Sequence, residues 1–220
     1  MAQLSLMTWP EVEARLSKGA SVILACGSTE QHGPMGLIGT DTICAGEVAL
    51  AVAEICDAVV APALAYTPAP FNTAFPGTVS ISEALFEDTL RQVCTGLLDQ
   101  GFQGVFLVNG HGANLAPART VAGTLLPGAL HIVSWWDPAT VAALRASLFG
   151  AWEGMHATPS EVSITQALHG AKPVGAAADP PKQLSAEYIK AHSGDRHGPP
   201  AQHRADFPDG RVGSHSALAR

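Results

Sequence analysis

The feature that most constrains the fold is a regular alternation between short apolar runs and segments with helical signals. By their length and composition, the apolar runs predict buried strands; they cover residues 21–25, 59–61, 104–108 and 130–133. The helical segments lie between or beside them, at residues 10–16, 41–56, 82–98 and 114–126. Strands that alternate with helices across short turns are typical of a mostly parallel sheet with helices on both faces. The sequence therefore predicts the α/β class.

Length and composition favour a single domain over residues 1–220. Hydrophobic residues make up 47% of the chain and charged residues only 14%, which excludes a disordered protein. A chain of this length can bury a core without disulfides or other cross-links. The four cysteines lack Cys-x-x-Cys spacing and lie in apolar segments, so we expect reduced core residues; they are Cys26, Cys44, Cys56 and Cys94.

The net charge and the absence of long apolar segments limit the partners and the compartment. The formal net charge is −7 and no basic run occurs, so neither nucleic acid nor an anionic membrane is an expected partner. No segment approaches the roughly 18 apolar residues of a membrane span, and the first residues do not resemble a signal peptide. The sequence therefore predicts a soluble, cytoplasmic protein.

Residues 171–220 differ from the rest of the chain. They are rich in Gly, Pro and His and show little periodicity, so we expect an irregular segment at a pocket rim or between subunits. Surface or intersubunit positions are expected for its histidines, which are His192, His197, His203 and His215. A low-charge, Ala-rich chain also tends to hide more surface than a monomer needs to, which favours a homo-oligomer.

Side chains of the metal-binding type follow two of the predicted strands. Glu30 and His32 come after the first strand and are two residues apart, so in an extended segment they share a face. Asp41 opens the next helix, and His111 follows the strand at 104–108. Ligands of open α/β sheets bind at the carboxyl ends of strands, and carboxylates with imidazoles suit transition metals. The pattern therefore predicts a metal site.

Each of these residues also has an ordinary structural interpretation. Asp41 could cap the helix that it begins. His111 could be a hydrogen-bonding turn residue, and Glu30 an exposed loop charge. All of these would have to hold at once for four ligand-type side chains at two strand ends, so we favour the metal site.

Four short motifs resemble those of the creatininase (creatinine amidohydrolase) family. They are residues 27–34 (GSTEQHGP), 39–41 (GTD), 109–114 (NGHGAN) and 156–161 (HATPSE). The resemblance covers roughly residues 7 to 215, in order. It implies a three-layer α/β/α fold with a mostly parallel central sheet, a two-metal hydrolytic centre and commonly a hexamer.

The resemblance also implies how the ligands divide between two metal ions. Glu30 and His111 would bind one ion and His32 the other, and Asp41 would bridge them. Creatininase has a further carboxylate two residues after the histidine of the third motif, where this chain has Ala113.

Family members with a small residue at that position take the carboxylate from the last motif, where Glu161 stands. The alternative for Glu161 is a helix cap, because residues 158–161 (TPSE) also form a capping box with Pro in the first turn. The departure at Ala113 favours the ligand role.

Four further residues are expected around the metal ions. His156 is the natural general acid/base, because its ordinary pKa of about 6.5 allows proton exchange near neutral pH; alternatively, it only orients the water. Trp152 and Trp136 match places where creatininase has aromatic pocket walls, with core packing as the alternative. Met35 stands where many members have a polar residue or His, so it would alter the substrate-binding wall.

The predicted function is metal-dependent hydrolysis of an amide-type bond, a cyclic amide or related C–N bond, in a small molecule. Two divalent ions would activate the water, and the mixed O/N ligand set accepts Zn, Mn or Fe. The chain lacks a Gly-x-Ser-x-Gly nucleophile elbow and a nucleotide-binding fingerprint. Two alternatives stay open. One is hydrolysis of a different bond, in a formamide, a lactone-like sugar derivative or a peptide. The other is a catalytically silent, metal-stabilised accessory protein.

Overall fold

The computed structural model describes residues 2–175 and 177–220. Its centre is a sheet of five parallel strands in the order β1-β3-β2-β4-β5. The strands are β1 (Ala2–Gln3), β2 (Val22–Cys26), β3 (Val59–Leu64), β4 (Val105–Asn109) and β5 (Leu130–Ser134). All four predicted strands are present, and β2 lies in the middle, where Leu24 pairs with Ala61 on one side and Leu107 on the other.

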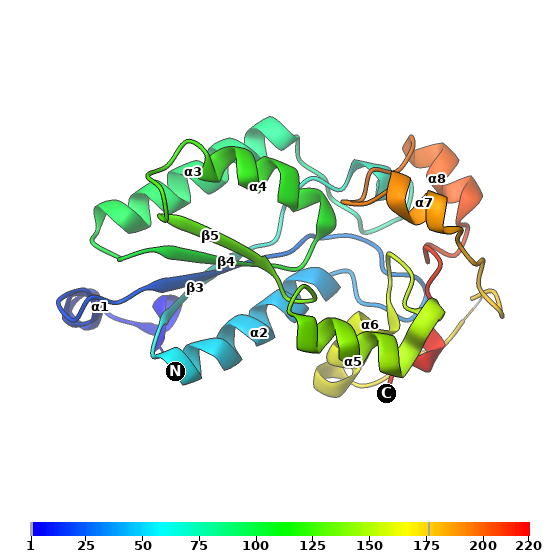
Figure 1. Cartoon of the computed structure of the whole chain (residues 1–220), viewed down its shortest axis with the longest axis horizontal. Coiled ribbons are helices and arrows are strands. Elements are labelled where there is room, and N and C mark those ends of the chain that lie inside the picture. Colours follow the sequence, from blue (N-terminus) through cyan, green and yellow to red (C-terminus); the bar gives the residue numbers. More distant parts are fainter. Residues whose placement is uncertain (1, 176) are drawn as a thin grey trace.

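Helices cover both faces of the sheet, as Figure 1 shows. They are α1 (Trp9–Leu16), α2 (Thr40–Cys56), α3 (Glu83–Asp99), α4 (Leu115–Ala122), α5 (Ala139–Phe149), α6 (Pro159–His169), α7 (Ala186–Ala191) and α8 (Pro200–Asp206). The helices α3 and α4 lie on one face and α2 on the other, with α5 and α6 toward the carboxyl ends of the strands. This arrangement confirms the predicted three-layer α/β/α fold.

The core is divided by the alternation of side chains along the strands. Val22 and Leu24 of β2 pack with α3 on one face, and Ile23 and Ala25 pack with α2 on the other. The side of α2 that meets the sheet consists of small residues, which let the helix lie close to it; they are Cys44, Ala45, Ala49 and Ala53. Three cysteines are buried as expected, whereas Cys56 at the end of α2 is exposed.

Two predicted segments differ from the structure. The helix predicted at 114–126 is shorter, because α4 ends at Ala122, residues 112–114 form a 3-10 turn, and the chain approaching Pro127 is no longer helical. Residues 171–220 are not wholly irregular, since they contain α7 and α8 at the carboxyl end of the sheet (Figure 1). Among the described residues, none of the helices combines the length and apolar composition needed to cross a bilayer.

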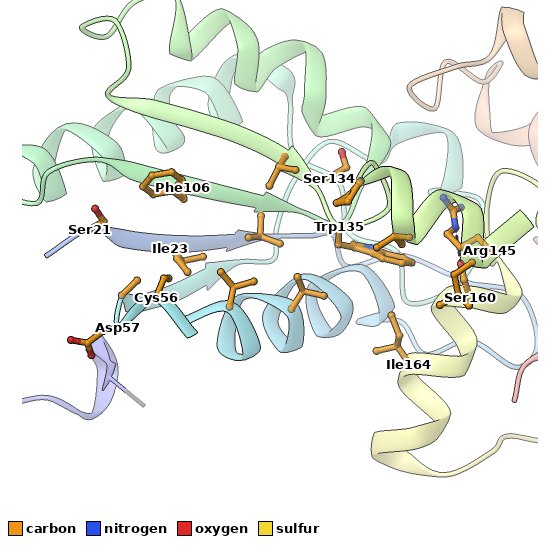
Figure 2. A pocket seen from close by; sticks show the side chains of 18 of the residues that line it. Ser21, Ile23, Cys56, Asp57, Phe106, Ser134, Trp135, Arg145, Ser160 and Ile164 are labelled. Atoms are coloured by element: carbon orange, nitrogen blue, oxygen red, sulfur yellow. Dashed lines mark hydrogen bonds between the residues drawn. The ribbon is translucent and has the colours of Figure 1, made fainter. Parts of the chain in front are cut away.

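Among the described residues, no helix covers one stretch of the sheet face that carries α2 (Figure 2). An apolar cavity of about 930 Å³ lies there, bounded by the strands, α2 and α5 (Figure 2). Ile23 and Phe106 form part of its floor, and Trp135 and Ile164 stand toward its other end. Phe106 is 41% exposed, which is unusual for a large side chain on a central strand.

Candidate metal centre

The carboxyl ends of β2 and β4 lie side by side, and the first turn of α2 packs against both. A Cβ atom at Gly27 would stand 2.2 Å from the backbone nitrogen of Thr42, and one at Gly110 would stand 2.2 Å from the carbonyl oxygen of Asp41. Only glycine fits at both positions, so the two strand-end turns hold the backbone of Asp41 between them.

This packing brings together six predicted site residues from four parts of the chain, and all of them are buried. They are Glu30, His32, Asp41, His111, His156 and Glu161. His32 Nε2 lies 2.8 Å from Asp41 Oδ1. His111 Nδ1 lies 3.1 Å from both Glu30 Oε1 and Asp41 Oδ2. The sequence therefore identified residues that are far apart in the chain and adjacent in the fold.

The structure excludes two of the ordinary interpretations. Glu30 is fully buried, so it is not an exposed loop charge. Asp41 does not cap α2, because Gly39 is the N-cap residue and no side chain caps the helix. The Asp41 carboxylate instead accepts a hydrogen bond from Ser28 Oγ at 2.8 Å.

The buried side chains form three overlapping groups in which the ligand atoms lie within 4.8 Å of one another. One group is Glu30, Asp41 and His111, and a second is His32, Asp41 and Glu161. Asp41 is common to both. The third group is Glu30, His32 and His156.

Hydrogen bonds to the backbone orient both histidines toward the carboxylates. His111 Nε2 donates to the Pro68 carbonyl oxygen at 2.8 Å, and His32 Nδ1 donates to the Glu30 carbonyl oxygen at 3.2 Å. When the ring loses its second proton, the remaining nitrogen can present a lone pair to a cation, as in metal-bound histidines. Glu30 Oε1 and His32 Nε2 face other side chains of the cluster, at 3.1 Å from His111 Nδ1 and 2.8 Å from Asp41 Oδ1. A divalent cation fits this donor set.

In the metal-free cluster, the pKa values of His32 and His111 show that both rings hold protons, which a cation would replace. Burial alone would lower the pKa of His32, but Asp41 beside it, with smaller contributions from Glu161 and Glu30, raises the pKa to about 10. The pKa of His111 is likewise raised well above its usual value, because Glu30 and Asp41 outweigh burial. Protons thus hold the metal-free cluster together, and cation binding must displace them.

Glu161 meets the conditions of both interpretations of its role. Its Oε2 accepts the Thr158 backbone N–H at 2.8 Å, and its own N–H donates to Thr158 Oγ1 at 3.2 Å, so the capping box at the start of α6 is formed. A carboxylate oxygen of Glu161 also belongs to the group with His32 and Asp41. Burial raises the pKa of Glu161 to about 7, against the opposing effect of His32.

The substitution Glu161→Gln separates these two roles. A glutamine oxygen can still accept the cap hydrogen bond, so we expect the helix content and the thermal unfolding transition to change little. The loss of a negatively charged ligand should lower the affinity of one of the two Zn²⁺ or Mn²⁺ sites by more than about 100-fold. That decrease is larger than the one expected when a residue that only hydrogen-bonds to a ligand is lost. Calorimetric titration of the metal-free variant measures this; two sites of wild-type affinity would leave Glu161 as a cap alone.

His156 is held as one particular tautomer. Its Nε2 lies 2.7 Å from the Gln31 carbonyl oxygen. The Gln31 side-chain amide cannot donate to the ring, because its two hydrogens go to Asn72 Oδ1 and the Gly210 carbonyl oxygen. His156 Nε2 is therefore the donor, and Nδ1 faces Glu30 Oε1 at 3.7 Å. Burial and the neighbouring His32 hold the pKa of His156 well below its usual value, so the ring is neutral.

The predicted pocket walls are only partly found at the site. A cavity of about 690 Å³ opens onto Glu30, Asp41 and His111, and Trp136 lines it. Met35 and Trp152 are not among its described lining residues: Met35 is buried, and Trp152 packs on the His215 ring. Trp135, the neighbour of Trp136 in the sequence, belongs to the core beside α2.

Two histidines of the C-terminal part are buried, contrary to the expectation of surface or intersubunit positions. His203 is 2% exposed, and the His197 side chain is 1% exposed. Both rings pack on Phe71, at centroid distances of 5.2 and 4.8 Å. The reason is that α8 packs on the 3-10 turn Pro70–Asn72, a contact between segments far apart in the sequence.

The structure also adds residues that the sequence reasoning missed. Asn72 donates from Nδ2 to Glu30 Oε2 at 2.9 Å, and Gln31 connects Asn72 with the backbone at Gly210. Asp195, from the C-terminal part, reaches to 3.8 Å from His111 Nδ1. Gln31 lies inside a recognised motif, whereas Asn72 and Asp195 lie in loops without periodicity.

A parallel α/β sheet with carboxylates and imidazoles buried at the carboxyl ends of its central strands defines a metal-binding α/β protein. A family model described as Creatininase, creatinine amidohydrolase, matches residues 5–219. The chain therefore belongs to the creatininase family.

Proteins of different named activities are similar to this chain. Creatinine amidohydrolase of Pseudomonas putida is 29% identical over 182 residues, which cover 74% of this chain and 70% of that protein. A mycofactocin precursor peptide peptidase of Mycolicibacterium smegmatis is 44% identical over 108 residues, 46% of this chain and 43% of its own length. The 3-dehydro-scyllo-inosose hydrolase of Thermotoga maritima is 36% identical over 107 residues, 48% and 34% of the two chains.

Solved creatininase structures share the fold. A mutant creatininase complexed with creatine has a TM-score of 0.75 at 24% identity and covers 100% of this chain and 90% of its own. A mutant creatininase of the Zn-Zn type has a TM-score of 0.67 at 25% identity, covering 84% and 80%. A creatininase described as Mn has a TM-score of 0.73 at 24% identity, covering 100% and 90%.

Proposed function

We propose that this creatininase-family hydrolase cleaves an amide-type C–N bond of a small molecule with the help of two divalent cations, Zn²⁺ or Mn²⁺. The observation that carries the proposal is the position of Asp41, which belongs to two ligand groups at once. The close contacts of His32 Nε2 with Asp41 Oδ1 and of Glu30 Oε1 with His111 Nδ1 support it, because a divalent cation can replace the protons that hold these buried groups together. We assign Glu30, Asp41 and His111 to one cation and His32, Asp41 and Glu161 to the other.

When bound, such cations lower the pKa of water and polarise a carbonyl oxygen. The protein's own contribution begins with His156, whose Nδ1 is free to accept a proton from the attacking water and to return it to the leaving nitrogen. Gln31 and Asn72 keep that nitrogen unprotonated by fixing the donor role of Nε2. Ser28 and Asn72 orient the carboxylates of Asp41 and Glu30. Burial of the cluster excludes bulk water and strengthens each of these interactions.

We propose that residues 1–220 act as one cytoplasmic metallohydrolase domain, and that the chain assembles as a homo-oligomer, a hexamer by family resemblance. The large apolar cavity beside α2 and α5 supports an oligomer, since monomers rarely leave such surface open to water.

Two alternatives keep specific support. The peptide peptidase and the inosose hydrolase among the relatives favour a different scissile bond. A metal-stabilised accessory protein is favoured by the near-complete burial of the cluster, which is also typical of structural metal sites.

Metal analysis followed by a hydrolysis screen tests the proposal. We expect two equivalents of Zn²⁺ or Mn²⁺ per chain, with turnover of an amide that stops on treatment with a chelator and returns when metal is added. The screen should contain cyclic amides, formamides, sugar lactones and short peptides at matched concentrations. Turnover confined to the lactones would assign a different bond, and bound metal without turnover of any class would favour the accessory protein.

A further inference from the structure

Asp195 is a carboxylate at the metal centre that the proposed mechanism does not use. It follows α7, and its side chain is 11% exposed. Its Oδ2 lies 3.8 Å from His111 Nδ1, the nitrogen that faces Glu30 and Asp41. Its Oδ1 lies 3.7 Å from His197 Nε2. Among the described residues its ionic contacts are with these two histidines, and no Lys or Arg forms an ion pair with it.

The surrounding backbone is shaped around this carboxylate. A Cβ atom at Gly112 would stand 2.2 Å from Asp195 Oδ2, so the glycine of the NGHGAN motif leaves the space that the carboxylate occupies. Gly194 and Asp195 have φ values of 76° and 55°, a left-handed turn that Gly and Asp tolerate best. The buried His197 ring contacts the Asp195 carboxylate, and neither of its nitrogens forms a regular hydrogen bond among the described residues.

Asp195 stands beside the ligand groups and is not a member of them. The three groups of atoms within 4.8 Å of one another do not include it. It lines the same cavity as Glu30, Asp41 and His111. A molecule bound in this cavity at Glu30, Asp41 and His111 would therefore have other atoms close to Asp195.

The other charged side chains of the cavity wall carry both signs and leave Asp195 as its least exposed carboxylate outside the ligand groups. Asp137 adds a second carboxylate that binds no predicted metal. Of the basic side chains that line the cavity, Arg145 is already paired with Glu153 at 2.8 Å, and Lys190 is exposed on α7.

We propose that Asp195 is a specificity-determining residue that binds an ammonium or similar cationic N–H group of the substrate, close to the carbonyl that is attacked. The protein then prefers amino-substituted amides to neutral ones of the same size. This inference rests on the proposed function for the position of the scissile group. Charge-assisted hydrogen bonds to a buried carboxylate are strong enough to produce such a preference.

The test uses two hydroxamates that differ only in charge, because a hydroxamate binds metal ions directly and its binding does not require turnover. In 3-aminopropanohydroxamate an ammonium group replaces the terminal methyl group of butanohydroxamate. We expect the Mn²⁺-loaded protein to bind the ammonium compound at least about tenfold more tightly in calorimetric titrations. In Asp195→Asn the preference should disappear, while the affinities for Mn²⁺ and for butanohydroxamate stay within about twofold.

The matched control is Asp137→Asn, which removes an exposed carboxylate of the same cavity and should keep the preference. An unchanged ratio in Asp195→Asn, equal affinities in the unsubstituted protein, or no binding of either compound would overturn the proposal. Weaker Mn²⁺ binding in Asp195→Asn would also overturn it, because the residue would then be a metal ligand. Failure of the amide screen would instead count against the proposed function, and the two binding ratios would still decide the role of Asp195.

Discussion

Asp41→Asn is expected to abolish the binding of both cations. Asp41 belongs to both ligand groups, so the loss of its charge weakens two sites through one substitution. Asparagine has only one acceptor oxygen and no charge, so it cannot face His32 and His111 as the carboxylate does. We expect the affinity of each site for Zn²⁺ to fall by more than about 100-fold. That decrease is larger than the one expected when a residue that only hydrogen-bonds to a ligand is lost. Calorimetry and metal analysis of the purified variant measure this.

Glu83→Gln is the matched control, because Glu83 is also an acidic residue in the first turn of a helix but lies far from the cluster in α3. It should bind two cations with unchanged affinity. Full metal occupancy in Asp41→Asn would contradict the assignment of Asp41 to two sites. Loss of one cation with retention of the other would restrict Asp41 to a single site.

His156→Ala is expected to keep both cations and to lose about 10²- to 10⁴-fold in turnover, as for a lost general acid/base. The tautomer fixed by Gln31 leaves Nδ1 as the atom that exchanges the proton, and alanine removes it. Steady-state kinetics on whichever amide the screen identifies, together with metal analysis, provide the measurement.

His156 also belongs to a third ligand group, with Glu30 and His32, so it could itself bind a cation. Loss of a cation in His156→Ala would make His156 a ligand and not a proton carrier. His131→Ala is the control, since His131 is an exposed histidine on β5 that stacks on Phe106. It should change neither turnover nor metal content.

The sheet could be predicted from the sequence because its central strands β2 and β4 are almost wholly buried, with Phe106 as the exposed exception. A fully buried strand must be apolar throughout, as residues 22–26 and 105–109 nearly are, so local composition is enough. The helix α5 lacks such a signal: its sequence is apolar without a clear periodicity, and Pro138 at its N-cap makes no side-chain cap. Its position depends on tertiary packing that no local pattern contains.

The residues of the candidate site also differ in whether the sequence could predict them. Glu30, His32, Asp41 and His111 could be identified because they follow strands whose ends must meet at one edge of the sheet. Glu161 and His156 were found through the resemblance, and Met35 and Trp152 show that a motif match does not guarantee a place on the cavity wall. Asp195 could not be found, because long-range packing alone brings residues 189–195 over His111.

The glycines that hold Asp41 between the ends of β2 and β4 have a consequence for the thermodynamics of metal uptake. Its backbone is already fixed by the folded sheet, and the backbone carbonyl oxygens of Pro68 and Glu30 already orient the two imidazoles. The conformational entropy of arranging the ligands is therefore lost during folding and not during binding. A cation would meet a preorganised site, so the metal-free and metal-loaded proteins should have nearly the same backbone, and uptake should be limited by dehydration and proton release instead of by rearrangement.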